Sequence, residues 1–419
     1  MADLKLAVDT STDAERAAVD GVVAPHDAAV VVESERTVRG GTHRRRERRH
    51  LLLPGLHALQ ATAGWISPGG LNYLCDQLQV PPAEAFGVAS FYELFRTTDP
   101  GHTQSVHHVC MDTACHVAGA EAYAAQLEAD GLQVHRGPCL GQCERAPARF
   151  VQGRNEAAHV PAARPGERIV LPQRAIAPDV ELRLLRRVGV VAPTSLASYR
   201  EHGGYVALAR AVELGAQGVI DAVRAAGLTG RGGAAFPTAI KWQGVADEHG
   251  RPKHVIANAD ESEPGTFKDR HLMEHDPFAL IEGLTLAGFA TGAEHGWIYL
   301  RGEYPLSTRR LEAAIEQCRT AGLLGDDAAG SGHRFDIELR RGAGAYICGE
   351  ETALMESLAG FRGEPRNKPP FPSTHGLFGE PTAVNNPETL LNALFIAQHG
   401  ADAYRAAGGH SVIRASRLD

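Results

Sequence analysis

The stretch of sequence that decides the fold reads Val255-Ile256-Ala257-Asn258-Ala259-Asp260-Glu261-Ser262-Glu263-Pro264-Gly265-Thr266. Its first residues are expected to form a strand, which ends at the amide of Asn258 and is followed by the three carboxylates of Asp260, Glu261 and Glu263. In an open α/β sheet, ligands bind at the carboxyl ends of the strands. Asn258 and Asp260 can pair with the polar edge of a flavin ring, and a carboxylate can hold ribose hydroxyls. The plainer interpretation is an acidic loop that caps the following segment.

The segments around this stretch alternate between expected helices and expected strands. The helices are expected near residues 204–226, 277–291, 305–320, 349–358 and 386–399, and the strands near residues 253–258, 296–300 and 334–339. Such alternation implies a parallel sheet covered by helices. Residues 203–407 are therefore predicted to form a Rossmann-like α/β domain.

The preceding part of the chain has a different pattern. Apolar spacing of three and four predicts short helices over residues 51–63, 68–79 and 81–95, followed by a strand at 105–110, a helix at 117–129 and a strand at 132–135. We expect five parts in all: a flexible leader (1–50), a first unit (51–150), a linker rich in Pro, Ala and Arg (151–202), the α/β domain (203–407) and a truncated tail (408–419).

Four of the seven cysteines form two tight pairs, each in a loop just after an expected strand. Cys110 and Cys115 have four residues between them, and Cys139 and Cys143 have three. A [2Fe–2S] cluster takes four thiolates, two for each iron. Structural zinc more often shows gaps of two residues, and scattered buried thiols would not pair in this way. The pattern favours the cluster, with zinc and free thiols as the alternatives.

A glycine-rich loop opens the second unit, with the sequence Gly227-Leu228-Thr229-Gly230-Arg231-Gly232-Gly233-Ala234-Ala235-Phe236-Pro237. Such backbone can lie flat against a ligand, and its N–H groups can form an anion nest. Lys241 could supply a phosphate charge. The loop follows a helix, whereas the ordinary dinucleotide fingerprint follows a strand, so a plain interdomain turn is the alternative.

Three further segments carry polar or aromatic groups. Residues 342–352 lead small residues into a helix start with acids in its first turn, where the acids could merely offset the helix dipole. Residues 365–372 form a proline-rich loop that can present Phe371 for stacking. Residues 384–389 have the character of a helix cap with side-chain amides to spare.

Composition excludes several classes of protein. The chain has 419 residues, 43% of them apolar, and a formal net charge of −8, which argues against a nucleic-acid-binding protein. The first twenty residues have no apolar core of a signal peptide, and no apolar run is long enough to span a bilayer. A location in the reducing cytoplasm is therefore expected.

Taken in order, the loops of the second unit resemble the NADH-binding flavoprotein subunit of respiratory complex I and its relatives. These relatives include the diaphorase subunits of NAD-linked formate dehydrogenases and NAD-reducing hydrogenases. Residues 51–150 resemble the thioredoxin-like [2Fe–2S] subunit that partners this flavoprotein, so the chain looks like a fusion of the two. The text of residues 363–368 is closest to the formate dehydrogenase branch.

The resemblance implies FMN, NAD(H) and a [2Fe–2S] cluster as cofactors, with the following residues at matching positions. The FMN and its phosphate would be cradled by Gly230, Gly232, Gly233 and Lys241, with Arg231 in the same loop. The isoalloxazine would be lined by Asn258, Asp260, Glu261, Tyr346, Gly349 and Glu350, and the phosphate and ribityl end would lie near Asn385 and Asn386. The dinucleotide would face Phe236, Glu263, Glu351, Lys368 and Phe371. The cluster ligands would be Cys110, Cys115, Cys139 and Cys143.

Two departures from the family pattern bear on function. Gly244 stands where complex I members carry an aromatic that stacks on the dinucleotide. Relatives also continue into a domain with a [4Fe–4S] cluster, whereas this chain stops at Asp419 without such a cysteine run, so a [4Fe–4S] cluster is not expected. The implied function is a diaphorase module of a multi-subunit redox complex of the formate dehydrogenase, hydrogenase or complex I type. The alternative is a truncated, non-catalytic scaffold or assembly module.

Overall fold

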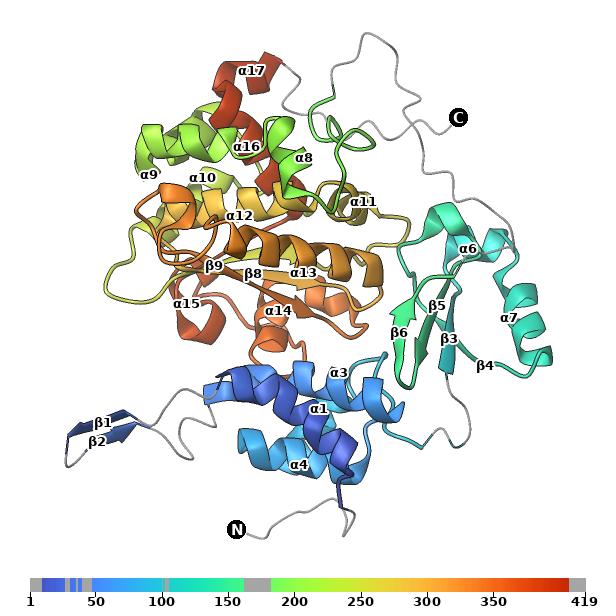
Figure 1. The fold of residues 1–419 in the computed structure, drawn as a ribbon. Coiled ribbons are helices and arrows are strands. Elements are labelled where there is room, and N and C mark those ends of the chain that lie inside the picture. The colour runs from blue at the N-terminus through green and yellow to red at the C-terminus, as the bar shows by residue number, and fades with distance from the viewer. Residues whose placement is uncertain are drawn as a thin grey trace.

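The computed structural model describes residues 10–26, 31–34, 37–39, 47–99, 101, 105–161 and 182–406 (Figure 1). This part of the chain forms a helical segment, a small sheet with its own helices, and a larger α/β domain. A short antiparallel hairpin, β1 (Val31–Ser34) and β2 (Thr37–Arg39), stands apart from them in the figure. The tail expected at 408–419 and residues 162–181 of the expected linker lie outside the described residues.

The helical segment contains α1 (Asp13–Val23), α3 (Leu52–Ala63), α4 (Pro68–Leu78) and α5 (Pro82–Ala89). Three of these helices were predicted; the third ends at Ala89, and the chain then turns so that Tyr92 and Leu94 are buried. The expectation of a flexible leader over residues 1–50 is wrong for α1, which packs on α3 and α4. Thr12 caps α1 through a capping box, and Val19 and Val23 join the core beside α3.

The small sheet has the strand order β4-β3-β5-β6 and comprises β3 (Ser105–Cys110), β4 (Gln133–Gly137), β5 (Arg149–Gly153) and β6 (Glu156–His159). Strands β3 and β4 are parallel, and β5 and β6 join them in antiparallel fashion. The expected helix over residues 117–129 is split into α6 (Thr113–Val117) and α7 (Ala120–Ala129), because Gly119 adopts a left-handed φ of 91° between them.

The larger domain has a sheet of four parallel strands in the order β10-β7-β8-β9. The strands are β7 (His254–Ala259), β8 (His295–Leu300), β9 (Asp336–Arg341) and β10 (Thr382–Asn385). The helices are α8 (Leu196–Glu201), α9 (Val206–Ala226), α10 (Thr238–Ala246), α11 (Lys268–His275), α12 (Pro277–Thr291), α13 (Pro305–Thr320), α14 (Glu351–Leu358), α15 (Pro372–His375), α16 (Pro387–His399) and α17 (Ala401–Ala406). The predicted parallel sheet and α/β class are confirmed.

The two faces of the larger sheet contribute to different cores. Because successive side chains in a strand point to opposite faces, Val255 and Ala257 pack with the domain's own helices, whereas Ile256 between them packs elsewhere. Ile256 shares its core with Trp297 and with residues of α3 and α4. Figure 1 shows α3 beneath α14 on this side of the domain. The helical segment therefore covers one face of the α/β sheet.

Two of the expected boundaries need correction. The linker expected over 151–202 contains most of β5 and all of β6, which complete the small sheet, so that domain extends to His159 or beyond. The same expected linker contains α8, whose Leu196 and Tyr199 are buried in the core of the larger domain. The sequence did not reveal either element, because this segment is rich in proline and arginine. Each element is also stabilised by strands or helices that are distant in sequence.

Candidate functional site: two cofactor sites that share a boundary

The four paired cysteines lie together at one edge of the small sheet. Cys110 ends β3, Cys115 lies in α6, and Cys139 and Cys143 follow β4. Their thiols form a row in the order Cys115, Cys110, Cys139, Cys143, in which each contacts the next. Because β3 and β4 are parallel, their carboxyl ends bring the two pairs to the same place.

Contacts among the thiols raise the pKa values of Cys110 and Cys143 and lower those of Cys115 and Cys139. The N–H of Gly141 donates to Cys139 Sγ and the N–H of Ala148 to Cys115 Sγ, both at 3.4 Å. A hydrogen bond with Cys110 lowers the pKa of Cys115 to about 7. Hydrogen bonds with Cys110 and Cys143 hold the pKa of Cys139 well below its ordinary value.

The row of thiols suits one of the alternatives considered above. Two thiols lie at each end of the row, and a [2Fe–2S] cluster takes two thiolates for each iron. The four cysteines fit a [2Fe–2S] cluster, and amide donors to sulfur of the kind present here tune such clusters.

The predicted flavin-site loops converge at the carboxyl end of the larger sheet. Asn258 Nδ2 donates to the carbonyl of Gly349 at 2.8 Å, and Tyr346 donates through its hydroxyl to Glu263 at 2.6 Å. A methyl group placed on Gly232 would lie 3.4 Å from Cβ of Asn386. The loops containing residues 230–237, 258–265, 346–351 and 385–386 therefore border one site.

The glycine-rich loop presents open backbone to this site. The N–H of Gly230 donates to Phe236 and that of Arg231 to Thr389, whereas the N–H groups of Gly232 to Ala235 donate to nothing in the described part of the chain. Gly233 has a φ of 118° with free space around it. Several unused N–H groups on an exposed glycine turn form an anion cradle that fits a phosphate tail.

Three lysines lie on segments that border the site, and each is near a carboxylate. Lys241 donates to the carbonyl of Val384 at 2.7 Å and lies 3.7 Å from Glu351; burial lowers its pKa. Lys368 contacts Glu351 at 2.7 Å. Lys268, which the sequence analysis did not select, lies 3.2 Å from Asn386 Oδ1 and pairs with Asp269 at 2.7 Å.

The acidic residues after β7 are perturbed by burial. Burial raises the pKa of Asp260 to about 7 and that of Glu261 to about 8. Glu261 accepts the N–H groups of Asp269 and Arg270 at 2.8 and 3.0 Å, so its carboxylate caps the first turn of α11. Asp260 remains at the centre of the site, 3.6 Å from a methyl group placed on Gly349.

Two predicted site residues are engaged elsewhere in the fold. Arg231 donates to the hydroxyl of Tyr404 in α17 at 3.0 Å, so its guanidinium anchors the loop to that helix. Asn385 is buried and accepts from Trp242 Nε1 at 3.2 Å. The side chains of both residues therefore hold the backbone of the loops that border the site.

Large aromatic side chains lie uncovered at the mouth of the site. Tyr346, Phe371 and Phe236 are 59%, 57% and 50% exposed. Apolar groups exposed together, unlike single exposed residues, often mark a site of ligand or partner binding. They supply flat surfaces on which a flavin or a nucleobase can stack, which completes the fit of this region to FMN and a dinucleotide.

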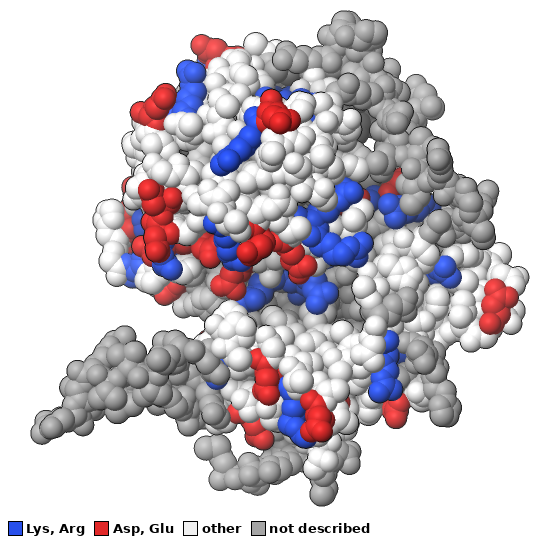
Figure 2. Space-filling model, in the orientation of Figure 1, with Lys and Arg blue, Asp and Glu red and all other residues white. Residues whose placement is uncertain are grey.

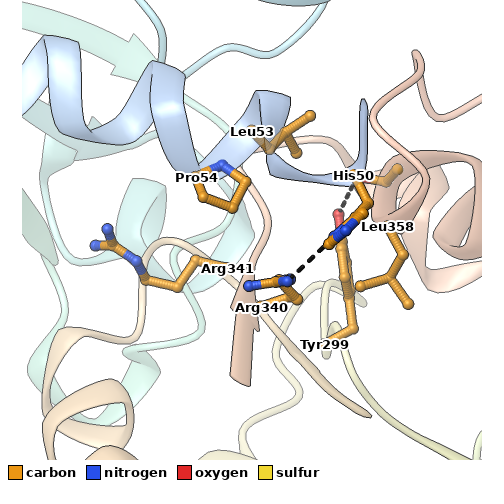
Figure 3. Close-up of a pocket in the computed structure, with 8 residues that line it drawn as sticks. His50, Leu53, Pro54, Tyr299, Arg340, Arg341 and Leu358 are labelled. Carbon is orange, nitrogen blue, oxygen red and sulfur yellow. Dashed lines mark hydrogen bonds between the residues drawn. The ribbon is translucent and has the colours of Figure 1, made fainter. Parts of the chain in front are cut away.

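A small pocket lies between the helical segment and the larger sheet. It is bordered by Pro54 of α3, Tyr299 of β8 and Arg340 of β9, with His50 3.3 Å from Arg340 (Figure 3). Its volume of about 10 Å³ has room for one water molecule at most. It belongs to the packing of the helical segment against the larger sheet.

The two sites meet through buried arginines that the sequence analysis missed. Arg301, directly after β8, donates to the carbonyls of Cys139 at 2.6 Å and Glu261 at 2.7 Å. Arg270 of α11 donates to the carbonyl of Gly141 at 2.9 Å. No local signal could have identified these residues, since their partners in the cysteine loop, Cys139 and Gly141, lie more than a hundred positions away in sequence.

Comparison with known proteins agrees with this geometry. Residues 40–162 match the thioredoxin-like [2Fe–2S] ferredoxin family and residues 223–394 match the Nuo51 FMN-binding domain family. The chain thus joins an iron–sulfur domain and a flavoprotein domain. The fusion predicted from the sequence is confirmed at the level of these two domains: a thioredoxin-like [2Fe–2S] ferredoxin domain followed by an FMN-binding domain of the Nuo51 type.

Among its relatives is an NADH-quinone oxidoreductase subunit of Rhizobium meliloti, 49% identical over 226 residues, which are 54% of each chain. The HndC subunit of the NADP-reducing hydrogenase of Solidesulfovibrio fructosivorans is 46% identical over 53% of this chain and 45% of that protein. The chain therefore spans about half the length of the curated relatives it matches. A crystal structure of an NAD⁺-reducing [NiFe]-hydrogenase is similar with a TM-score of 0.68 and 32% identity, over 85% of this chain and 62% of the other.

No helix in the described ranges combines the length and the apolar character needed to cross a membrane. On the face shown in Figure 2, acidic and basic side chains are interleaved where the larger domain meets the helical segment.

Proposed function

We propose that this chain is a diaphorase module: it accepts hydride from NAD(P)H and passes single electrons to an iron–sulfur chain, or runs in the reverse direction. The observation that carries the proposal is the shared boundary of the two sites. Arg301 bonds the carbonyls of both Cys139 and Glu261, so the loop of a cluster ligand and the loop of the flavin site are one packed unit.

FMN, when bound, supplies the chemistry that converts a two-electron hydride transfer into single-electron transfers. The protein's own residues bind and orient the reactants. The unused N–H groups of residues 232–235 and the nearby lysines would hold the phosphate tail. Asn258, Asp260 and the backbone at Gly349 would border the ring. No general base is required, and we assign none.

The dinucleotide would enter over the exposed aromatic side chains. Phe236 and Phe371 would stack on it, and Glu351 would bind its hydroxyl groups. Lys368 pairs with Glu351 at 2.7 Å, and binding of the dinucleotide would replace this ion pair by contacts to the ligand. Gly244, which lies against Ser373 rather than presenting an aromatic, leaves Phe371 as the stacking surface on that side.

Partners and location extend the same proposal. The relatives are named as subunits of NADH-quinone oxidoreductase and of a hydrogenase, which supports assembly with further redox subunits. The formate dehydrogenase branch, suggested by residues 363–368, remains a prediction. Seven free cysteines suit a reducing compartment, and we place the chain in the cytoplasm. The alternative of a non-catalytic scaffold gains no support from the relatives.

Purification under anaerobic conditions tests the proposal. We expect about one FMN and two irons with two sulfides per chain, and reduction of ferricyanide by NADH or NADPH. Protein without flavin and without activity, even after reconstitution with FMN, iron and sulfide, would contradict it.

A further inference from the structure

The two cysteine pairs are held by different parts of the molecule. The first pair is held within the small domain: the N–H of Cys110 donates to the carbonyl of Ala148 at 3.1 Å, and the N–H of Ala148 donates to Cys115 Sγ. The loop of the second pair is held from the larger domain. Arg270 and Arg301 bond its carbonyls at Gly141 and Cys139.

Packing reinforces the contact of this second loop with the flavin site. A methyl group placed on Gly141 would lie 2.2 Å from the hydroxyl of Tyr304, so only glycine permits this approach. The same Tyr304 hydroxyl lies 3.3 Å from the carbonyl of Glu261. The backbone of Gly265, in the flavin-site loop, is among the groups that lower the pKa of Cys139.

Arg301 occupies the centre of this junction. Its side chain is 3% exposed, and one guanidinium bridges the carbonyls of Cys139 and Glu261. The carboxylate of Glu303 pairs with it at 3.0 Å, and that side chain is only 6% exposed; the charge of Asp260 also acts on Arg301. Charges buried in this way are weakly screened and act over longer distances than surface charges.

We propose that Arg301 is a positioning residue that locks the loop of the second cysteine pair to the flavin-site loop, and that its charge stabilises the reduced form of the cluster on the four cysteines. The inference rests on the proposed function, because it requires a [2Fe–2S] cluster at those cysteines. Reduction of such a cluster adds one electron, and therefore one negative charge, and no bond need form or break. A buried cation beside the ligand loop favours the state with the added negative charge.

Arg301 and Glu303 carry opposite charges, so removing each charge should shift the midpoint potential of the cluster in the opposite direction. Arg301→Gln removes a positive charge and should lower the midpoint potential of the cluster, whereas Glu303→Gln removes a negative charge and should raise it. We expect at least a tenfold change in the ratio of reduced to oxidised cluster at a fixed potential, which is about 59 mV for a one-electron couple. Arg301→Lys keeps the charge and should remain close to the unmodified protein.

The measurement is a mediated redox titration of the full chain, followed by the electron paramagnetic resonance signal of the reduced cluster. Arg136→Gln is the matched control, since this arginine lies in the same small domain but pairs with Glu121 and Glu128 at the surface. Its potential should not change. Because dithionite and mediators set the potential, the readout does not depend on turnover with the dinucleotide.

The outcomes separate the two proposals. Opposite shifts in Arg301→Gln and Glu303→Gln support the electrostatic role. Shifts in the same direction, or unchanged potentials in both, overturn it and leave the diaphorase function standing. If Arg301→Gln loses its cluster, Glu303→Gln alone decides by the presence or absence of a positive shift. An unmodified protein that binds no cluster contradicts the proposed function, and this inference with it.

Discussion

The cysteine site and the dinucleotide side of the flavin site differ in how deeply their side chains are buried and in which groups they contact. Three of the four cluster cysteines are buried, and their thiols contact one another. At the mouth of the flavin site, by contrast, Tyr346 and Phe371 are more than half exposed, and Lys368 and Glu351 pair with each other. A tightly bound prosthetic group suits the first arrangement and an exchanging substrate suits the second.

The largest effect of a substitution is expected at the cysteines. Cys139→Ser should abolish the cluster, because the row of four thiols would be interrupted at a residue that contacts two others. Iron and sulfide content and the paramagnetic resonance signal measure this. Bound FMN should be retained. Cys318→Ser is the control, since Cys318 is buried in α13 next to Tyr205 and should leave the iron content unchanged. A full cluster in Cys139→Ser would remove that residue from the ligand set.

The second prediction concerns the open side of the flavin site. Glu351→Ala should raise the KM for the dinucleotide roughly 10- to 150-fold, as expected for loss of a charged hydrogen bond worth about 1.5–3 kcal/mol. The FMN content should be unchanged. Glu364→Ala, which removes a surface carboxylate paired with Arg362, is the matched control. Steady-state kinetics that match the unmodified protein would exclude Glu351 from the dinucleotide site.

The third prediction tests the glycine cradle. At Gly233 the φ of 118° strains any other residue, so Gly233→Val should weaken FMN binding roughly 5- to 150-fold, equivalent to about 1–3 kcal/mol. Quenching of FMN fluorescence by the flavin-free protein measures the affinity. Gly250→Val introduces comparable strain at a φ of 72° in the turn before β7, and it should leave FMN affinity intact. Equal losses in both variants would indicate a general effect on the fold.

The smallest expected effect depends on pH. Burial raises the pKa of Asp260 to about 7, above its ordinary value of 3.8. The folded protein therefore binds this proton more tightly than the unfolded chain, so stability from this group is full below pH 3.8 and is lost as the pH rises towards 7. Asp260→Asn should flatten the fall in Tm between pH 5 and pH 8 by a few degrees, measured on flavin-free protein. If the Tm of Asp260→Asn and that of the unmodified protein change equally with pH, the assignment of this pKa to Asp260 is wrong.

Much of the fold follows from local sequence, because several elements carry their own signals. Strand β3 and helices α12 and α13 begin and end where the sequence predicts, and both helices start with a proline at a first-turn position. The missed elements lack such signals. Only Phe150 and Val151 of β5 are buried, and the strand is defined by pairing with β3 about forty residues earlier. Helix α1 was concealed by its acidic surface residues.

The residues of the two sites likewise divide into those that local sequence identifies and those that it does not. Tight spacing identifies the cysteine pairs without knowledge of the fold, and the glycine-rich loop is visible in the same way. The junction between them is not visible in sequence, since Arg301 reaches Cys139 across 162 positions and Arg270 reaches Gly141 across 129. Lys268 had one available signal, as a cation that follows the acidic loop after β7 within a few residues.

Anaerobic addition of NADH or NADPH to the purified chain most directly tests the claim that the two sites form one electron-transfer unit. We predict that the flavin absorbance is bleached and that the paramagnetic resonance signal of a reduced [2Fe–2S] cluster develops in the same sample. If dithionite reduces the cluster but neither dinucleotide does, while the flavin is fully bleached, the two sites are not coupled and the claim is wrong.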